Sequence, residues 1–398
     1  MSTERRLKGT IEKRGENKYR LTVSAGFDAD GRRIRHRRTI TAANDREAET
    51  QLAMFIAEIE GGGYYEPSRL RFGEFARKWL KEYAEPNLAP KTVFRYRDMI
   101  EQRIIPALGH LVMDKIKPLH IVEFENSLRQ DGTRLDGTPG GLSERTILHH
   151  HRLLSIMFNT AVNWGILKDS PMHRVQAPRV RKKKVPSFNE EETAAMLKAL
   201  EQEPLKYRVL IHLALTTGLR RGELLGLEWS DIDFEEGTLE VNRASQSLPG
   251  LGTFTKEPKT EESQRKISLP TSTVQLLKEY RREWLEHRMK VGDLWQGSNR
   301  LWTTWDGRPV HAQTPSKWFT KFLERHGLPH MPFHGLRHTS ATLLIRQGID
   351  VRAVSSRLGH SRTSTTLDVY VHELRSADRA AAEVMDAILG ATLGSKNA

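Results

Sequence analysis

The residues that could carry out chemistry are spread over the C-terminal half of the chain. Arg220 follows a helix-breaking glycine in TTGLRRGE, so we expect its guanidinium just beyond a helix end. His334 and Arg337 are three residues apart in HGLRHT, and a helix would place both on one face. His360 lies in LGHS, and Tyr370 follows ten residues later. Each residue taken alone is more often a surface cation or a packed core residue.

Taken together, these residue types fit attack on a phosphate. Two guanidinium groups can clamp a phosphate through forked donors, and nearby histidines can donate to its oxygens or transfer protons. A tyrosine hydroxyl can form a covalent intermediate once its proton is removed. The pKa of free tyrosine is about 10, so adjacent cations are needed to favour the phenolate. Arg, Lys and His can neutralise the charge, so this chemistry requires neither a metal ion nor another cofactor.

Several other chemistries are excluded. The chain contains no cysteine, which rules out disulfides, Cys-ligated zinc, iron–sulfur clusters and a cysteine nucleophile. It has no GxxxxGK[ST] phosphate-binding loop. His334 and His338 have the spacing of a zinc-protease helix, but Gly335 stands where the glutamate would be. The consecutive histidines 149–151 would point in different directions on a helix and make a poor metal site.

The order and spacing of these segments resemble the phage integrase family of tyrosine recombinases, specifically its larger members from temperate phages and integrative conjugative elements. TTGLRRGELLGLEWSDID resembles the family's first box, HGLRHTSATLL its second and LGHSRTSTTLDVYVH its last. EPKTEESQRKISLP resembles the hairpin that carries the catalytic lysine. The second box has Gly335 where the family usually has Asp, a position that is not catalytic in the family.

The resemblance implies a site and a reaction. The implied catalytic residues are Arg220, Lys259, His334, Arg337, His360 and the nucleophile Tyr370, with Glu223 as the acidic partner of Arg220. Lys256 and Lys266 lie near Lys259 and are alternatives to it. In the implied reaction, Tyr370 attacks the scissile phosphate of duplex DNA, a 3′-phosphotyrosine linkage forms, and Lys259 protonates the leaving 5′-oxygen. Two such rounds through a Holliday junction join two DNA attachment sites within a homotetramer, without ATP. The sequence leaves open whether an excisionase or a host DNA-bending protein takes part.

Charge and composition favour a polyanionic partner over a merely basic surface. Lys and Arg number 63 against 50 Asp and Glu, a formal net charge of +13. Hydrophobic residues make up 37% of the chain, enough for packed cores. The N-terminus has no apolar segment of a signal peptide, and no run approaches the roughly 18 apolar residues of a membrane span. We therefore expect a cytoplasmic, nucleoid-associated protein of a bacterial host, with no membrane partner.

The elements that must position the site form a multidomain chain, since 398 residues exceed one hydrophobic core. The residue patterns predict a small three-stranded sheet plus helix, a helical domain, and a mostly helical α+β domain. The resemblance implies that the second is a core-binding domain and the third the catalytic domain. A helix is also expected in the C-terminal tail, where it either covers its own domain or docks on a neighbouring protomer. The expected boundaries are 1–62 for the arm-type DNA-binding domain, 68–178 for the core-binding domain, 179–186 for a basic linker, 187–376 for the catalytic domain and 377–398 for the tail.

Two basic segments are candidate DNA contacts outside the catalytic site. Residues 5–38 contain 12 Lys and Arg against 4 Asp and Glu, in a short alternating pattern that predicts strands. The linker is bounded by prolines and rich in Lys and Arg. A generic basic appendage and a plain hydrophilic linker are the simpler alternatives. The candidate DNA-binding residues are Arg32, Arg33, Arg35, Arg37, Arg38, Arg181, Lys182, Lys183 and Lys184.

Three other functions would use similar residues. A type IB topoisomerase has related chemistry but relaxes supercoiled DNA without a specific site, and the N-terminal module and the HGLRHT and LGH segments favour a recombinase. A chromosome-dimer resolvase of the same family is typically shorter and lacks an arm-binding module, so residues 1–60 argue against it. A non-catalytic repressor descended from a recombinase would usually have lost at least one of the six catalytic residues.

Overall fold

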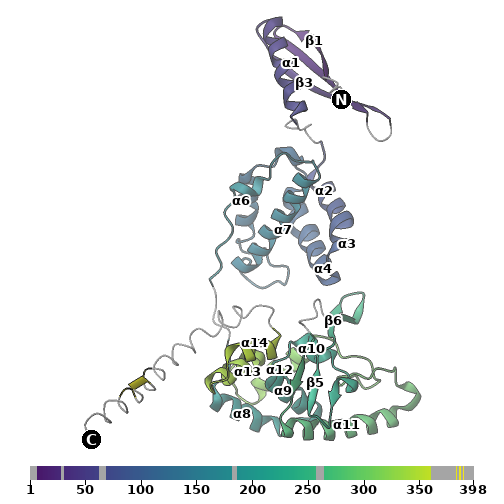
Figure 1. Ribbon diagram of the computed structural model, residues 1–398, viewed down its shortest axis with the longest axis vertical. Helices are drawn as coiled ribbons and strands as arrows, with labels where there is room; N and C mark the ends of the chain where they lie inside the picture. The colour runs from purple at the N-terminus through teal and green to yellow at the C-terminus, as the bar shows by residue number, and fades with distance from the viewer. Residues whose placement is uncertain are drawn as a thin grey trace. The chain divides into compact units, whose positions relative to one another are not determined.

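The chain divides into two compact units, Met1–Arg181 and Lys182–Ala398, which are described separately (Figure 1). The computed structural model describes residues 7–27, 31–61, 69–181, 186–256 and 264–359, together with Ala382, Met385, Asp386 and Leu389. Among these residues, no helix combines the length and the apolarity that a membrane span requires.

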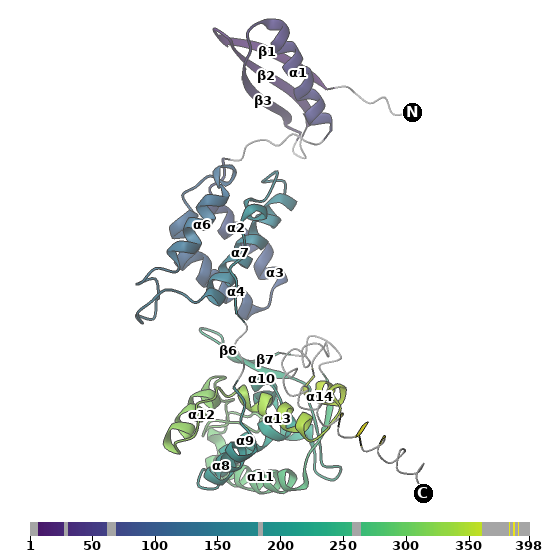
Figure 2. The same cartoon turned by 90° about the vertical axis from the view of Figure 1, so that its left-hand side faces the viewer.

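The first unit begins with a three-stranded antiparallel sheet covered on one face by a helix. The strands β1 (Lys8–Gly15), β2 (Lys18–Phe27) and β3 (Arg33–Thr41) pair in chain order. Helix α1 (Asp45–Glu60) lies along the sheet in Figure 2. Leu21 and Val23 of β2 pack against Phe55 of α1, and all three are fully buried. This confirms the predicted sheet and helix, and among the described residues no element covers the opposite face of the sheet.

The rest of the first unit is helical and surrounds its own core. Trp79 and Phe158 are fully buried in that core, and Trp79 Nε1 donates to Thr160 Oγ1 at 3.1 Å. Ser143 caps the longest of these helices by accepting from Thr146 N at 3.3 Å, as expected for a serine that precedes a helix. The α-helices are α2 (Phe72–Trp79), α3 (Glu85–Asn87), α4 (Pro90–Met99), α5 (Ile105–Leu108), α6 (Pro118–Ser127) and α7 (Glu144–Asn163), with π-helical turns at Leu80–Ala84 and Ile100–Ile104.

The second unit combines helices with two small sheets, and its largest core cluster includes Trp302, Phe319 and Phe322. Its sheets are β4–β5–β8 and the hairpin β6–β7. The strands are β4 (Ile232–Asp233), β5 (Thr238–Glu240), β6 (Ala244–Leu248), β7 (Gly252–Lys256) and β8 (Lys266–Ser268). The helices are α8 (Glu190–Leu200), α9 (Leu205–Thr217), α10 (Arg221–Gly226), α11 (Thr271–Val291), α12 (Thr314–Arg325), α13 (Gly335–Arg346) and α14 (Val351–Leu358).

Two local features of this unit differ from the sequence-based expectation. The sequence predicts a capping box from Ser187 to Glu190, which is wrong by two residues. Asn189 is the cap: it accepts from Glu192 N at 2.7 Å, while Glu192 accepts from Asn189 N at 2.9 Å. The β6–β7 hairpin was not expected, because ASQSL and GTFTK offer little apolar alternation. The residue pattern also predicts strands over 237–242 and 265–269, and the structure confirms them as the shorter strands β5 and β8.

Candidate active site

Two glycine-capped helix ends form the framework of the site. Helix α9 ends at Gly218 and α14 at Gly359, with φ of +62° and +68°, a region that glycine adopts without strain. A Cβ at Gly218 would overlap Leu358, and a Cβ at Gly359 would lie 2.6 Å from Arg265 Nη1. The end of α9 can therefore pack closely against Leu358 of α14 only because Gly218 lacks a side chain, while Gly359 leaves the space that the Arg265 guanidinium occupies. Figures 1 and 2 both place α10, α13 and α14 beside one another in this part of the unit.

Arg337 joins these two helix ends. It lies in the first turn of α13 and is 3% exposed. Its Nη1 donates to the carbonyl of Gly218 at 2.7 Å and to that of Leu358 at 2.8 Å. Both acceptors are helix-terminal carbonyls, which carry partial negative charge and favour a cation. The guanidinium is thus held by the backbone of two other segments.

Arg220 is held as firmly but remains accessible. Its Nη1 donates to Glu223 Oε1 at 2.8 Å, its backbone N to Glu223 Oε2 at 3.0 Å, and its Nη2 to the Gly359 carbonyl at 2.8 Å. The side chain is nevertheless 43% exposed. A cation fixed in place before an anion arrives needs little reorganisation to stabilise it. Arg220 and Arg337 therefore converge on the consecutive carbonyls of Leu358 and Gly359.

The histidines around Arg337 are held in the neutral form. His334 is an exposed residue at the start of α13, and its ring lies edge-on to His338 with centroids 5.1 Å apart. Partial desolvation, reinforced by the guanidinium groups of Arg337 and Arg220, lowers the pKa of His334. A neutral imidazole still carries one N–H that can donate to a phosphate oxygen. His334 can therefore act as a hydrogen-bond donor at neutral pH.

The stability of the fold should depend on the protonation of His338. Burial, with smaller contributions from His334 and Arg337, lowers the pKa of His338 to about 4. The unfolded chain, with a histidine pKa of about 6.5, binds the proton more readily. The contribution of neutral His338 to the free energy of unfolding is therefore fully present above a pH of about 6.5. It is lost as the pH drops toward 4, which lowers the free energy of unfolding by on the order of 3 kcal/mol. Thermal unfolding midpoints measured across this range should show a flatter decline for His338→Gln, whereas exposed His311→Gln should follow the wild type. Parallel curves for all three proteins would contradict this.

Gly335 leaves space that the buried side chain of Met331 occupies. A Cβ at Gly335 would lie 2.5 Å from Met331 Sδ and 3.0 Å from the Pro186 carbonyl. Met331 is fully buried, and its Sδ accepts from Thr339 Oγ1 at 3.7 Å. Met331 therefore fills the position that the side chain usual in the family would need.

Several predicted site residues fall outside the described part of the chain. His360, Tyr370 and Lys259 are among them, as are Lys182, Lys183 and Lys184 of the linker. Arg181 is described and exposed. Of the tail, the four described residues are helical. The roles assigned to these residues stay predictions.

The N-terminal sheet separates the predicted DNA-binding arginines onto two faces. Arg33, Arg35 and Arg37 alternate along the exposed face of β3. Arg38 points to the other face, where it pairs with Glu58 at 2.8 Å and lies 4.4 Å from the centre of the Phe55 ring. Arg32 is exposed just before β3. The structure thus brings three of the candidates together and places Arg38 in the packing of α1 on the sheet.

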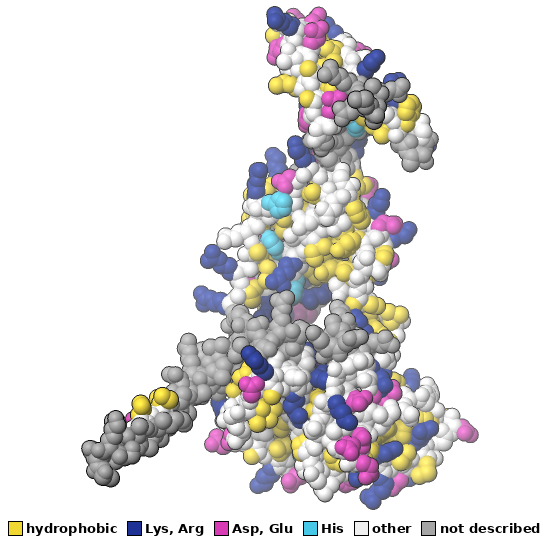
Figure 3. Space-filling view, in the orientation of Figure 1, with side chains coloured by type: hydrophobic (Ala, Val, Ile, Leu, Met, Phe, Trp, Pro, Cys, Tyr) yellow, Lys and Arg dark blue, Asp and Glu magenta, His cyan; other side chains and the backbone are white. Residues whose placement is uncertain are grey.

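A basic cluster on the helical part of the first unit was missed by the sequence analysis. Arg145, His149 and Arg152 have i, i+4, i+7 spacing on α7, and Arg95 comes from α4. Partial burial, followed by the charges of Arg95, Arg152 and Arg145, lowers the pKa of His149. The helical spacing was the available signal. Figure 3 shows Lys, Arg and His side chains on the visible face of this part.

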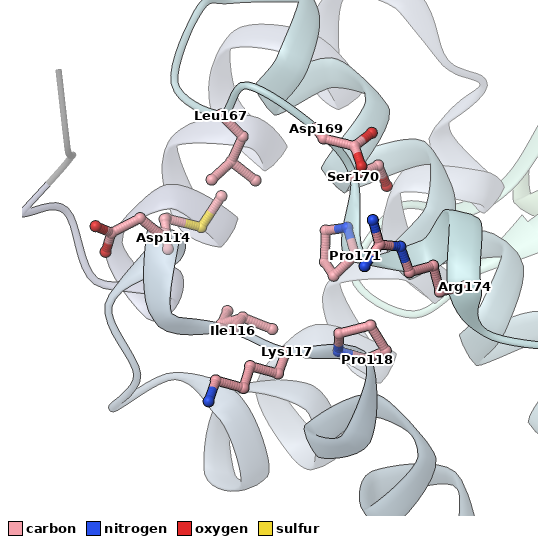
Figure 4. Close-up of a pocket in the computed structure, with 10 residues that line it drawn as sticks. Asp114, Ile116, Lys117, Pro118, Leu167, Asp169, Ser170, Pro171 and Arg174 are labelled. Carbon is pink, nitrogen blue, oxygen red and sulfur yellow. The ribbon is translucent and has the colours of Figure 1, made fainter. Parts of the chain in front are cut away.

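A small pocket in the first unit is not part of this constellation. Its volume is about 210 Å³, below the several hundred Å³ typical of small-molecule sites. Figure 4 shows Leu167, Ile116 and Pro171 around the pocket, while the charged ends of Asp114 and Lys117 point away from it. Asp169, Ser170 and Arg174 also line the pocket, but its small volume leads us to assign it no role.

Comparisons with known proteins follow the same division of the chain. Residues 186–376 match the phage integrase family, and residues 71–129 match the phage integrase N-terminal SAM-like domain. A tyrosine recombinase XerC-like protein of Caldanaerobacter subterraneus is 31% identical over 392 residues, 94% of this chain and 97% of that protein. The ICEBs1 integrase of Bacillus subtilis is 27% identical over 96% of this chain and all of its own length.

Solved structures show the same fold. The integrase of transposon Tn1549 in complex with transposon right end DNA aligns with a TM-score of 0.65, 22% identity, and coverage of 79% of this chain and 99% of that one. A lambda integrase tetramer bound to a Holliday junction aligns with a TM-score of 0.55 and 19% identity, over 89% and 94% of the two chains. The family resemblance, the expected fold class and the expected enzyme class are confirmed. The chain belongs to the phage integrase family and is a tyrosine recombinase.

Proposed function

We propose that this tyrosine recombinase is the integrase of a mobile element, and that it uses Arg220, Arg337 and Tyr370 to cut and rejoin attachment-site DNA. One observation carries the assignment. Arg220 and Arg337, from separate segments, donate to the consecutive carbonyls of Gly359 and Leu358, directly before His360 in the chain. The guanidinium groups therefore converge beside the segment that leads to Tyr370.

In the proposed reaction, the hydroxyl oxygen of Tyr370 attacks the scissile phosphorus, and its proton passes to solvent. The bond from phosphorus to the 5′-oxygen breaks, Lys259 protonates that oxygen, and a 3′-phosphotyrosine linkage remains. Arg220, Arg337, His334 and His360 stabilise the charge on the non-bridging oxygens, and Glu223 orients Arg220. The 5′-hydroxyl of the partner strand reverses the step, so a phosphodiester is exchanged for a phosphodiester without ATP.

The other tyrosines of the second unit support Tyr370 as the nucleophile. Tyr280 is buried and donates to the Leu301 carbonyl at 2.7 Å, and burial raises its pKa. Tyr207 stacks on Trp318 with ring centres 4.1 Å apart, and burial, helped by Glu203, raises its pKa as well. A nucleophilic phenolate needs the opposite environment. Tyr370 is the remaining tyrosine of residues 186–398.

The proposed partners follow from the names of similar proteins. Lambda integrase forms a tetramer on a Holliday junction, and we extend this homotetramer to the present chain. The ICEBs1 integrase supports a mobile element as the source of the DNA. The reaction then takes place in the cytoplasm of the bacterial host, at its nucleoid. The domain boundaries given above, with residues 1–62 binding distal arm sites, form part of this proposal.

The exposed face of the N-terminal sheet should bind DNA phosphates. Thr22 and Ser24 lie opposite Arg37 and Arg35 on this face, and strands can enter the major groove. Replacing Arg33, Arg35 and Arg37 together by glutamine should weaken binding to element-end DNA and reduce the slope of log K against log salt by about 3, roughly one unit per phosphate contact. Titrations at several salt concentrations measure this slope.

The matched control lies on the helix of the same module. Arg46 is exposed on α1, away from the uncovered face, and Arg46→Gln should leave affinity and slope unchanged. A triple variant with the wild-type slope would exclude this sheet face as a DNA-binding surface.

The proposed function is tested by covalent trapping. The protein is incubated with nicked duplexes that cover both ends of its native element, without metal or ATP, and denaturing gels show whether DNA stays attached. Peptide mapping of the adduct should identify Tyr370. Adducts on native ends but not on scrambled duplexes support a site-specific integrase. Adducts on any duplex would indicate a topoisomerase, and DNA binding without adducts would indicate a non-catalytic DNA-binding protein.

A further inference from the structure

Arg265 is a buried cation that the proposed cleavage reaction does not use. It lies directly before β8 and follows the segment 257–263, which contains Lys259. Its side chain is 9% exposed, and its carbonyl accepts from Val241 N at 3.0 Å. The backbone of Arg265 is therefore attached to the chain that follows β5, while its guanidinium lies inside the protein.

The guanidinium of Arg265 shares a carboxylate with Arg220. Arg265 Nη2 lies 2.8 Å from Glu223 Oε2, and Arg220 Nη1 lies 2.8 Å from Glu223 Oε1. Burial alone would raise the pKa of Glu223, but the charge of Arg265, followed by that of Arg220, lowers it. Glu223 therefore remains a carboxylate between two cations. Without Arg265, the Glu223 carboxylate would pair with Arg220 alone. It would then neutralise more of the positive charge that Arg220 can offer to a phosphate.

Arg265 also contacts the end of α14. Its Nε donates to the Arg357 carbonyl at 2.9 Å, and its Nη1 occupies the space that a Cβ at Gly359 would need. Gly359 in turn accepts from Arg220 Nη2 at 2.8 Å. One side chain thus contacts both the carboxylate that orients Arg220 and the helix end that precedes His360.

We propose that Arg265 is a positioning residue for strand cleavage, which orients Arg220 through Glu223 and fixes the end of α14 before His360. This role rests on the function proposed above. Arg265 does not contact the phosphate in this role; its effect passes through Glu223 and the α14 backbone.

The test separates cleavage from DNA binding. Single-turnover adduct formation on a nicked element-end duplex is measured at saturating DNA, and Kd for the same duplex is measured by titration. Arg265→Gln should lower the cleavage rate by about 100-fold, on the scale of losing one oriented donor, while Kd changes by less than about threefold. Arg265→Lys keeps a cation beside Glu223, so its cleavage rate should be about tenfold higher than that of Arg265→Gln. The control Arg282→Gln, at an exposed position on α11, should behave as wild type.

A double-mutant cycle tests the route through Glu223. If Arg265 acts through this carboxylate, the two substitutions should not act independently. The fold-loss in cleavage rate of the double variant Arg265→Gln/Glu223→Gln should then be much smaller than the product of the fold-losses of the two single variants. Wild-type cleavage rates in both Arg265 variants, fully multiplicative effects, or a loss confined to Kd would each overturn the proposal. If Arg265→Gln lacks a cooperative thermal transition, Arg265→Lys carries the comparison. Absence of an adduct with wild-type protein would instead refute the proposed function itself.

Discussion

Substituting Tyr370 by phenylalanine is expected to abolish the covalent protein–DNA adduct. The phenyl ring keeps the shape of tyrosine but lacks the oxygen that would attack phosphorus. Loss of a nucleophile lowers turnover by on the order of 10⁴-fold or more, so no adduct should be visible on denaturing gels with nicked element-end duplexes. Affinity for the same DNA should stay within about twofold, because DNA binding depends mainly on cations distributed over the chain.

The matched control is Tyr207→Phe in the same unit. Tyr207 stacks on Trp318, and phenylalanine preserves that contact, so this variant should form adduct at the wild-type rate. An adduct that persists in Tyr370→Phe and disappears in Tyr207→Phe would reverse the assignment. Persistence in both variants would place the nucleophile on another residue type.

Arg337→Lys should lower the single-turnover rate of adduct formation by about 10³-fold. Removing one preorganised donor to developing charge typically costs 10²–10³ in rate. Lysine also lacks the planar fork that lets one guanidinium serve several acceptors. The carbonyls of Gly218 and Leu358 would lose the donor that joins α9 to α14. Quench-flow or time-course gels at saturating DNA measure the rate.

Two further variants make this result interpretable. Arg346→Lys alters an exposed arginine on the same helix and should leave the rate unchanged. Arg220→Lys should also reduce the rate by about 10³-fold. Because the Arg220 side chain is 43% exposed, its replacement should disturb the fold less than the replacement of buried Arg337. A folded Arg337→Lys protein that cleaves at the wild-type rate would remove Arg337 from the catalytic set.

Much of the site could be predicted because its residues lie in short segments with strong local signals. The spacing of His334 and Arg337, and the glycine before Arg220, are visible without any structure. The sequence also predicts the alternation of Arg33, Arg35 and Arg37 along a strand. These features depend on periods of two and of 3.6 residues, which the backbone imposes wherever the chain forms a strand or a helix.

The remaining features depend on contacts between distant segments, which no local pattern contains. Arg38 belongs to the same basic run as Arg37, yet its partner is Glu58 on α1. Arg265 is one of many basic residues until Glu223 and the Arg357 carbonyl are seen beside it. The β6–β7 hairpin has weak alternation, so its pairing was not recognised. Side chains that bridge separate segments were therefore the main omission.

The close packing of Met331 against Gly335 has a consequence for substitutions at either position. A side chain at 335 would overlap the buried side chain of Met331, so a substitution of Gly335 requires Met331 to shift. A smaller residue at 331 would provide the room, but it would leave a cavity in the core for as long as residue 335 is glycine. The effects of substitutions at the two positions are therefore expected to be non-additive.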